Sequence, residues 1–393
     1  MIPLPVDALR GLGDLVTEAD SVTGVQVDSR RVRPGDLFVA VGGGAAFLDD
    51  ARARGAAATL VPADDFGALA AIGHAVRSRM QARVVAITGS VGKTSTKDIL
   101  AALLRPQVNV VAAEDGFNNE IGLPLTLCRV EADTDVVVTE MGMRGAGQIR
   151  ALAEIARPHV GLITSIAPVH LELLGSIENV ARAKAELLEV AEIGIVPAGE
   201  PLLAQYEARR FPRPEVEIRD GHAIVDGVEF SFSARHQAEN AAAALAVLDA
   251  LGLARPSGVV EVEFSRWRSQ ETELPGGGLL INDAWNANPV AMRAALAHLG
   301  DRAAGRRTIA ILGAMAELGA AAARFHEEIG RELGSVDVVI GVGELARGYA
   351  PTEWVATAAD AVALARERVQ PGDVVLVTGS RSVGLEIVAE ALA

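Results

Sequence analysis

Lysine is scarce in this chain of 393 residues: of its 36 Lys and Arg residues, only Lys93, Lys97 and Lys184 are lysines. Arginine keeps its proton and presents a broad planar fork, whereas lysine is compact and becomes a neutral amine when burial lowers its pKa. We therefore expect each lysine to stand where a guanidinium does not serve. Lys93 and Lys97 share one short segment, so Lys184, far away in sequence, is the lysine that most needs an explanation.

Cysteine is nearly absent, and net positive charge and long apolar runs are missing as well. Cys128 is the only cysteine, no charged-then-apolar leader precedes Val6, and no apolar run approaches the ~20 residues of a membrane span. The formal net charge of −15 argues against a general binder of nucleic acid or of anionic membranes. These absences predict a soluble, cytoplasmic protein with no nucleic-acid partner and no membrane span.

The segment from Val84 to Leu100 carries the clearest motif, because an apolar β-branched run, a glycine-framed turn and an amphipathic helical pattern follow one another directly. Gly89 and Gly92 let the backbone approach an anion, and the free N–H groups of the helix start point at it. Lys93 and Thr94 then predict a phosphate loop, with the ammonium on the β- and γ-phosphates and the hydroxyl on Mg²⁺. The alternative, a plain glycine turn, needs no Lys-Thr pair.

Buried-strand patterns alternate with helical patterns after this loop, which predicts a doubly wound parallel sheet. The strand segments are VVAIT, VNVVA, DVVVTE, VGLITSI and EIGIV. Ligands of such sheets bind beyond the carboxyl ends of the strands, where Thr94, Glu140 and His170 are expected. A carboxylate and an imidazole beside a phosphate loop suit one or two Mg²⁺ ions, although each residue taken singly also fits an ordinary loop.

Lys184 falls within the apolar stripe of a helix predicted from Ile177 to Ala191. Glu178, Arg182 and Glu186 form an i, i+4 ladder on the opposite face, where a merely solubilising lysine is expected instead. Two interpretations stay open, a lysine that snorkels out of the stripe and an amine with a function.

Length and composition shifts predict three domains, at residues 1–82, 83–270 and 271–393. Residues 197–233 predict a peripheral antiparallel ribbon, and residues 235–252 predict an Ala-rich helix. The pattern breaks at 267–274, and the segments near 81–83 and 267–274 are the expected hinges. The third unit repeats the strand–helix rhythm with TIAILG, VDVVIG and DVVLVTG.

Three features of the third unit have competing interpretations. Asn288 and Pro289 predict an N-cap and first helical residue, which leaves Asp283 and Asn286 unexplained. The turn after VVLVT echoes the phosphate loop without its Lys-Thr pair, so it is either a second anion contact or a recurring strand-to-helix turn. The pattern GxGxxA at 341–346 matches a dinucleotide fingerprint, but a lone fingerprint this late in a chain is weak.

Together these motifs resemble the Mur ligase family over nearly the whole chain. The matching segments are DSRRVRPGDLF from Asp28, TGSVGKTS from Thr88, FNNEIGLPLTL from Phe117, EMG from Glu140, ITSIAPVHLE, ENVARAKAE, Arg235-His236, NANP from Asn286, AELG from Ala316 with His326, and GSR from Gly379. The compressed phosphate loop is the form that this family uses. The branch that the chain most resembles adds D-alanyl-D-alanine to a UDP-N-acetylmuramoyl tripeptide.

The resemblance implies a three-domain α/β ligase that acts as a monomer in peptidoglycan precursor synthesis. A small N-terminal α/β domain would bind the UDP-sugar, a central phosphate-loop domain with a parallel sheet would bind ATP, and a C-terminal Rossmann-like domain would bind the amine and border the adenine. The substrate carboxylate would attack ATP to give an acyl phosphate, which the amine then displaces. The third residue of the tripeptide stays open between lysine and diaminopimelate.

The resemblance also implies roles for particular residues. It gives Lys93, Glu140, His170 and Lys184 catalytic roles, and it places two Mg²⁺ ions on Thr94, Glu140, His170 and a CO₂-derived carbamate of Lys184. The implied ATP-binding residues are Gly89, Ser90, Val91, Gly92, Lys93, Thr94, Ser95, Asn119, Asp283, Asn286 and Asn288. The implied substrate-binding residues are Asp28, Ser29, Arg30, Arg235, His236, His326 and Arg381.

Two alternatives to this function stay open. The first is a Mur-like ligase for another carboxylate, which is suggested by GGGAAFLDD where the family has an Asp-Gly-His segment, and by Ala284, Ala314 and Thr378 where the family has Ser, Asp and Lys. The second is an inactive, ATP-binding regulatory paralogue. Retention of Glu140, His170 and Lys184 argues against it, and the lack of an NKxD motif argues against a GTPase switch.

Overall fold

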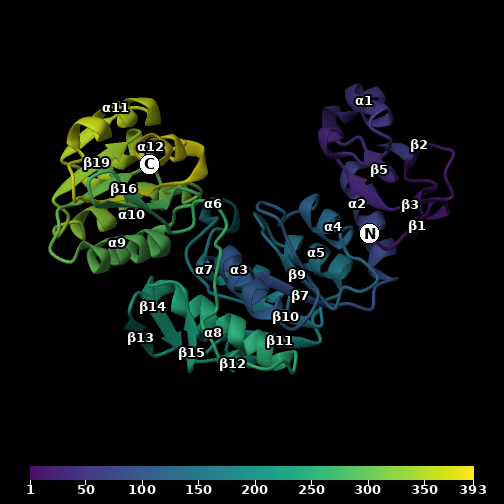
Figure 1. The fold of residues 1–393 in the computed structure, drawn as a ribbon, viewed down its shortest axis with the longest axis horizontal. Helices are drawn as coiled ribbons and strands as arrows, with labels where there is room; N and C mark the ends of the chain where they lie inside the picture. The colour runs from purple at the N-terminus through teal and green to yellow at the C-terminus, as the bar shows by residue number, and fades with distance from the viewer.

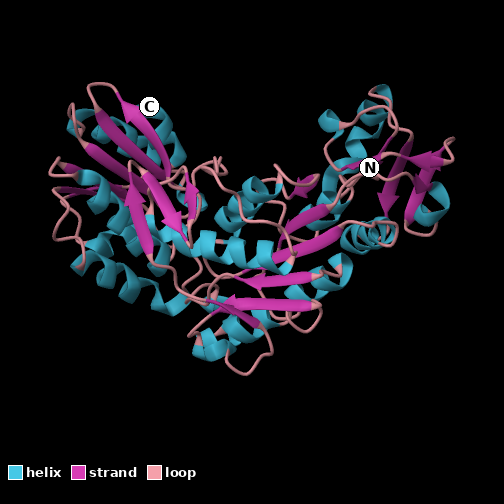
Figure 2. Ribbon diagram, turned by 60° about the horizontal axis from the view of Figure 1, so that its bottom comes forward, coloured by secondary structure: helices cyan, strands magenta, loops and turns pink.

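Five β-sheets organise the computed structural model, which describes all residues from 1 to 393. Figure 1 shows the N-terminal and C-terminal units at opposite ends of a central unit, and Figure 2 shows the same arrangement turned by 60°. None of the helices is long and apolar enough to cross a bilayer. The three-domain α/β architecture expected from the sequence is confirmed.

The N-terminal unit is a four-stranded mixed sheet beside a two-stranded ladder. Its strand order is β2 (Gly13–Thr17), β6 (Ala58–Pro62), β5 (Asp36–Val39) and β4 (Gly24–Gln26), and β1 (Leu4–Pro5) pairs with β3 (Ser21–Val22). Helix α1 spans Leu48–Ala53, and α2 spans Asp65–Arg77. Asp64 caps α2 by accepting a hydrogen bond from the Phe66 N–H, which satisfies one of the free donors of that helix start.

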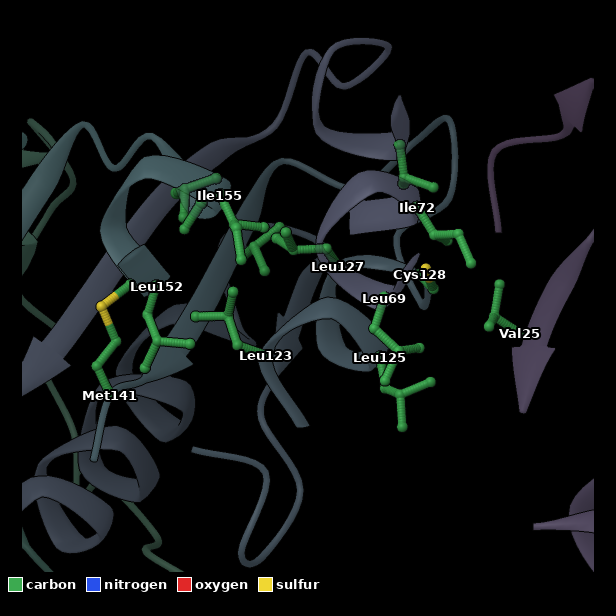
Figure 3. Close-up of a cluster of buried hydrophobic side chains, with 14 of the residues drawn as sticks. Val25, Leu69, Ile72, Leu123, Leu125, Leu127, Cys128, Met141, Leu152 and Ile155 are labelled. Carbon is green, nitrogen blue, oxygen red and sulfur yellow. The ribbon is translucent and has the colours of Figure 1, made fainter. Parts of the chain in front are cut away.

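Helix α2 also forms the contact with the central unit. Its buried face packs on α4 (Gly122–Leu127) and α5 (Gln148–Ala156), and Figure 3 shows Leu69 and Ile72 of α2 in one apolar cluster with residues of α4 and α5. A Cβ on Gly73 would lie 3.0 Å from Cγ2 of Ile155, so the close approach depends on a glycine there. This boundary is therefore mainly an apolar core.

The central unit is built on a six-stranded sheet in which every strand pair is parallel, as the alternating pattern predicts. Its order is β12 (Arg209–Phe211), β11 (Ile193–Pro197), β10 (Val160–Ile163), β7 (Arg83–Thr88), β9 (Val136–Glu140) and β8 (Val110–Ala112). Helices α3 (Lys93–Leu104) and α8 (Arg235–Ala250) pack on each other. The predicted ribbon is an antiparallel sheet of β13 (Val216–Arg219), β14 (His222–Val225) and β15 (Val228–Phe230).

Helix α7 (Ile177–Ala185) ends six residues earlier than the apolar stripe predicts. Beyond Ala185 the chain tightens into i−3 turns, in which the Leu187 N–H donates to the Lys184 carbonyl and the Leu188 N–H to the Ala185 carbonyl. These turns bring Leu187 against the sheet at Gly161, where a Cβ would lie 2.9 Å from the Leu187 side chain. The C-terminal part of the apolar stripe therefore lies in a turn and not in the helix. A short helix, α6 (Leu171–Leu174), precedes α7.

The C-terminal unit is a second six-stranded sheet. Its order is β16 (Gln270–Leu274), β17 (Gly278–Asp283), β21 (Val374–Thr378), β18 (Thr308–Leu312), β19 (Val338–Val342) and β20 (Glu353–Val355). Its helices are α9 (Pro289–Ala303), α10 (Ala322–Arg331), α11 (Ala358–Arg368) and α12 (Glu386–Leu392). Only β16 runs antiparallel to its neighbour. Most of the segment 267–274, which the sequence predicts to be an irregular boundary, is therefore an edge strand.

The C-terminal unit confirms one local prediction from the sequence and contradicts another. Asn288 caps α9 by accepting from the Val290 and Ala291 N–H groups, which confirms the predicted helix start. The interpretation of residues 341–346 as a dinucleotide-binding fingerprint is wrong. Gly343 leads into a 3₁₀ helix at Glu344–Tyr349, whereas such a fingerprint needs an α-helix whose N-terminus binds the pyrophosphate. The division at residues 82 and 270 stays a proposal. The separate sheets support it to within one residue, since Gln270 already pairs with Asn282 in the C-terminal sheet.

Candidate functional site

Two cavities meet at the carboxyl edge of the central sheet. The first has a volume of about 140 Å³ and the second about 560 Å³. The first is lined by residues 90–95, Asn118, Glu140, His236, Gln237, Asn240, Arg268, Ser269, Asp283, Trp285, Asn286, Asn288, Ala291 and Ala294. The second is lined by Lys93, Asn118, Asn119, Glu120, Gly142, Met143, Arg144, Gln148, His170, Lys184, Trp285, Asn286, Ala316, Glu317, Ser380, Arg381 and Ser382. Lys93, Asn118, Trp285 and Asn286 border both cavities.

The topology explains why three of the predicted residues converge. Strands β10, β7 and β9 are neighbours in the parallel sheet, and His170, Thr94 and Glu140 follow or end these strands. Carboxyl ends of parallel strands lie at one edge, so residues 76 positions apart in sequence reach one site.

The phosphate-loop backbone requires both of its glycines. Gly89 has φ +151° and Gly92 has φ +86°, and a Cβ would lie 1.9 Å from Oγ1 of Thr164 at the first and 2.1 Å from Oδ1 of Asn240 at the second. Helix α3 begins at Lys93 without a side-chain cap, so its first N–H groups are free to bind an anion. The loop is thus built as an anion cradle at the floor of the first cavity.

Thr94 and Glu140 contact each other in the first cavity. The Thr94 hydroxyl donates to Oε2 of Glu140 at 2.9 Å, and Nδ2 of Asn118 donates to Oε1 at 2.9 Å. Arg268 reaches in from the segment before β16, and its Nη2 lies 3.2 Å from Oγ1 of Thr94. A hydroxyl and a carboxylate side by side are oxygen ligands of the kind that Mg²⁺ prefers.

Two lysines share one carbonyl oxygen between the cavities. Nζ of Lys93 donates to the Gly89 carbonyl at 2.9 Å, and Nζ of Lys184 donates to the same oxygen at 3.0 Å. Lys184 is 1% exposed, so it does not snorkel to the surface. Burial lowers the pKa of Lys184 far below its ordinary value, and the charge of Lys93 lowers it further. Burial also lowers the pKa of Lys93, against an opposing effect of Glu140.

His170 lies in the second cavity with Lys184. Its backbone is left-handed, with φ 53°, and its Nδ1 lies 2.5 Å from Oε2 of Glu317, which belongs to the C-terminal unit. Burial lowers the pKa of His170, an effect that Glu317 opposes and that Lys184 and Lys93 reinforce. No three His, Cys, Asp or Glu side chains cluster as a ready-made metal cage. Any ion here would take ligands from bound phosphates as well, which Mg²⁺ sites commonly do.

The predicted adenine-side residues line the first cavity. Oδ1 of Asp283 accepts from the Ser269 N–H at 3.0 Å, and burial raises the pKa of this carboxyl. Asn286 is exposed and borders both cavities, whereas the side-chain oxygen of Asn288 is used by the cap of α9. Asn119 lies at the second cavity, where its Oδ1 accepts from the backbone at the start of α4.

The predicted substrate-binding residues are scattered. Arg381 lines the second cavity, with its guanidinium 4.3 Å from the ring centre of Trp267. His236 lies in the first cavity instead, 3.2 Å from Oγ of Ser269, and Arg235 lies 3.6 Å from Asp301 on the surface.

The remaining predicted residues reach neither cavity. Ser29 and Arg30 belong to a 3₁₀ turn at Ser29–Arg31 in the N-terminal unit, and Asp28 caps this turn and pairs with Arg30. His326 is fully buried in the C-terminal core, with Nε2 accepting from the Met315 N–H and Nδ1 beside the Ala322 carbonyl. Both ring nitrogens of His326 are engaged inside the core, which argues against a substrate-binding role for this residue.

Several cavity residues carry no signal in the sequence. Arg268 and Trp285 lie in segments whose composition predicts a domain break and a turn, and a guanidinium beside a Trp has no characteristic spacing. Asn118 adjoins the predicted Asn119, and Asn240 shares a helix face with His236. Glu317 lies within the AELG segment, but only its three-dimensional contact with His170 distinguishes it.

Known proteins of similar sequence match the central and C-terminal units of this chain. The family model described as "Mur ligase middle domain" matches residues 87–217, and "Mur ligase, glutamate ligase domain" matches residues 267–381. A UDP-N-acetylmuramoyl-tripeptide--D-alanyl-D-alanine ligase of Mycobacterium tuberculosis is 34% identical over 470 residues, covering 94% of this chain and 92% of the relative.

Solved structures agree with this similarity. MurF from Acinetobacter baumannii superposes with a TM-score of 0.86 at 25% identity, over 99% of this chain and 98% of that one. MurF ligase from Thermotoga maritima, solved in complex with ADP, gives a TM-score of 0.82 at 28% identity, over 94% of this chain and 97% of that one.

Proposed function

The chain belongs to the Mur ligase family, and we infer that it uses ATP to join D-alanyl-D-alanine to a UDP-N-acetylmuramoyl tripeptide. It is an ATP-dependent ligase of peptidoglycan precursor synthesis. The observation that carries the assignment of its residues is that Lys93 borders both cavities. One cation can therefore face the phosphates of a nucleotide on one side and the reacting carboxyl group on the other.

In the first step, the carboxylate of the tripeptide attacks the γ-phosphorus of ATP. An acyl phosphate forms, and ADP leaves as the bond between the γ-phosphorus and the bridging oxygen breaks. We assign the first cavity to ATP, with its phosphates on the free N–H groups of α3 and its adenine toward Asp283 and Asn286. Lys93 and Arg268 would stabilise the negative charge that grows on the transferred oxygens. The uncapped helix start supports this assignment.

In the second step, the amine of D-alanyl-D-alanine attacks the acyl carbon, and phosphate leaves from the tetrahedral oxyanion. We assign the second cavity to this meeting of acyl group and amine. Arg381 offers a cation for the terminal carboxylate of the dipeptide. The N-terminal unit, with Asp28, Ser29 and Arg30, stays the proposed holder of the UDP-sugar.

Two Mg²⁺ ions fit the residues that the cavities bring together. Thr94 and Glu140 would hold one ion, and His170 with Lys184 the other. When bound, Mg²⁺ supplies positive charge that offsets the charge on the phosphate oxygens. Two observations support this assignment of the ions to two sites. A hydroxyl lies beside a carboxylate at the first site, and an imidazole lines the same cavity as a buried amine at the second.

Lys184 contributes as a carbamate in this proposal. Its low pKa makes a neutral amine available, whose nitrogen forms a bond to the carbon of CO₂ and releases one proton. The product carries a carboxylate in place of a cation that would repel a metal. Arginine cannot make this change, which accounts for a lysine in a chain that otherwise prefers arginine.

A phosphate-release assay tests the function. With ATP, Mg²⁺, UDP-N-acetylmuramoyl tripeptide and D-alanyl-D-alanine, we expect phosphate release that depends on both substrates. Release only with a folate or another peptide acid would move the assignment to a different Mur-like ligase, and no release with any acid would favour a regulatory paralogue. Running the assay with lysine-containing and diaminopimelate-containing tripeptides decides the third residue. Gel filtration tests the proposed monomer, and fractionation of cells tests the proposed cytoplasmic location.

A further inference from the structure

We propose that Glu317 is a positioning residue for His170, so that the second metal site is complete only when the C-terminal domain is docked on the central one. The inference rests on the proposed function, since it uses the assignment of His170 as a metal ligand. It adds a residue that acts through His170 and comes from a different domain.

The contact that carries the inference joins two domains. Nδ1 of His170 is buried and lies 2.5 Å from Oε2 of Glu317, and no group of the protein, Glu317 included, meets it with full hydrogen-bond geometry. A carboxylate at Nδ1 holds the proton on that nitrogen and fixes the ring orientation. Nε2 is then the nitrogen left with a lone pair for a cation.

The backbone on both sides of this contact is unusual. His170 has φ 53° and Glu317 has φ 61°, and both lie in the left-handed region that residues other than glycine seldom adopt. Such conformations persist where the surroundings hold them, and they concentrate at functional sites. The two loops are thus shaped so that their side chains meet.

Neighbouring contacts hold the two loops together. A Cβ on Gly319 would lie 3.2 Å from Cα of Glu172, so the loops approach closely because this residue is a glycine. Leu171, next to His170, packs against the apolar core of the C-terminal domain. Arg144 of the central domain lies 3.8 Å from Oε1 of Glu317, which leaves Oε2 for the imidazole.

The consequence is a coupling between docking and metal binding. His170 belongs to the central domain, whereas Glu317 arrives with the domain proposed to carry the amine. When the C-terminal domain swings away, His170 loses the partner that fixes its ring. The second metal ion is then held tightly only in the arrangement in which the amine can reach the acyl group.

The experiment titrates Mn²⁺ into the full-length protein in the presence of ADP and follows binding by calorimetry and electron paramagnetic resonance. We expect two Mn²⁺ sites in the wild type and, in Glu317→Ala, a 10- to 100-fold loss of affinity at one of them. The affinity for ADP should stay at the wild-type value. Glu317→Asp should restore part of the loss, because a carboxylate remains.

Two further measurements separate positioning from a structural role. In ¹⁵N spectra of the histidine rings, the His170 signal, assigned with His170→Gln, should change from one dominant tautomer in the wild type to a mixture in Glu317→Ala. The matched control is Glu327→Ala, an exposed carboxylate of the same domain, which should change neither readout. Wild-type affinity at both sites in Glu317→Ala, or an unchanged His170 signal, overturns the role of Glu317. A wild type that binds only one Mn²⁺ refutes the metal assignment on which the inference rests, whatever Glu317 does.

Discussion

The central domain meets its two neighbours through different chemistry. Toward the N-terminal domain it presents apolar surface, where Leu69 and Ile72 of α2 pack into a cluster shared with α4 and α5 (Figure 3). Toward the C-terminal domain it presents polar groups, and both cavities lie along that boundary. An apolar boundary stabilises a fixed arrangement, whereas a polar one can exchange its partners for water and ligands.

This difference sharpens the expectation of domain motion. The sequence predicts hinges near 81–83 and 267–274, but the shared apolar core argues that the first moves little. The second contains Trp267 and Ser269, both with positive φ, in a segment held to α3 by hydrogen bonds from Ser265 to Asp98. We therefore expect closure on substrate binding to occur mainly at the polar boundary.

The largest effect is expected where the polar boundary meets the phosphate loop. Lys93→Ala removes the one cation that borders both cavities, so turnover should fall by about 10²- to 10⁴-fold. Steady-state phosphate release measures this loss. The melting temperature is the control, and it should change little. An enzyme that keeps most of its turnover would contradict the phosphate-loop assignment.

Lys184→Arg comes next in size. The substitution keeps a basic side chain of similar length but cannot form a carbamate, so we expect nearly complete loss of turnover. Adding ¹³C-bicarbonate should give a carbamate resonance in the wild type and none in the variant. Full activity of Lys184→Arg would show that the buried amine has only a structural role.

The apolar boundary should respond in stability instead of turnover. Leu69 is fully buried in α2, so Leu69→Ala should lower the free energy of unfolding by about 2–5 kcal/mol. Turnover per folded molecule should remain near the wild-type value, because neither cavity touches this residue. Phe66→Ala on the exposed face of the same helix is the control, with an expected change below about 0.5 kcal/mol. If Leu69→Ala and Phe66→Ala both lost turnover to a similar degree, the proposed difference between the apolar and the polar boundary would be contradicted.

Acid should lower the stability of the folded protein through His236, which lies at the polar boundary, and this effect is small until the pH falls well below 6.5. Burial, helped by the nearby His298, lowers the pKa of His236 from 6.5 to about 4. The unfolded chain therefore binds a proton between these pH values that the folded chain excludes, so stability falls as the pH drops from 6.5 to 4. The loss from this group approaches about 3 kcal/mol near pH 4. Urea unfolding at several pH values measures it, and a His236→Gln variant with the wild-type pH dependence would contradict it.

The sequence predicts more of the architecture than of the site. The parallel sheet, the ribbon and the cap at Asn288 follow from local patterns, because periodicity and turn chemistry act within one segment. The early end of α7 was not predictable, since it depends on Leu187 packing against a glycine of a distant strand. Arg268 and Glu317 were missed for the same reason: their roles come from partners in another domain, which no local spacing records.

The two lysines that share the Gly89 carbonyl differ in how a reagent can reach them. Lys184 and Lys97 are buried, whereas Lys93 is partly exposed and borders both cavities. A small amine-reactive mass tag should then label Lys93 ahead of the other two lysines, and nucleotide should protect it. The extent of labelling at Lys93 would give a footprint of cavity occupancy.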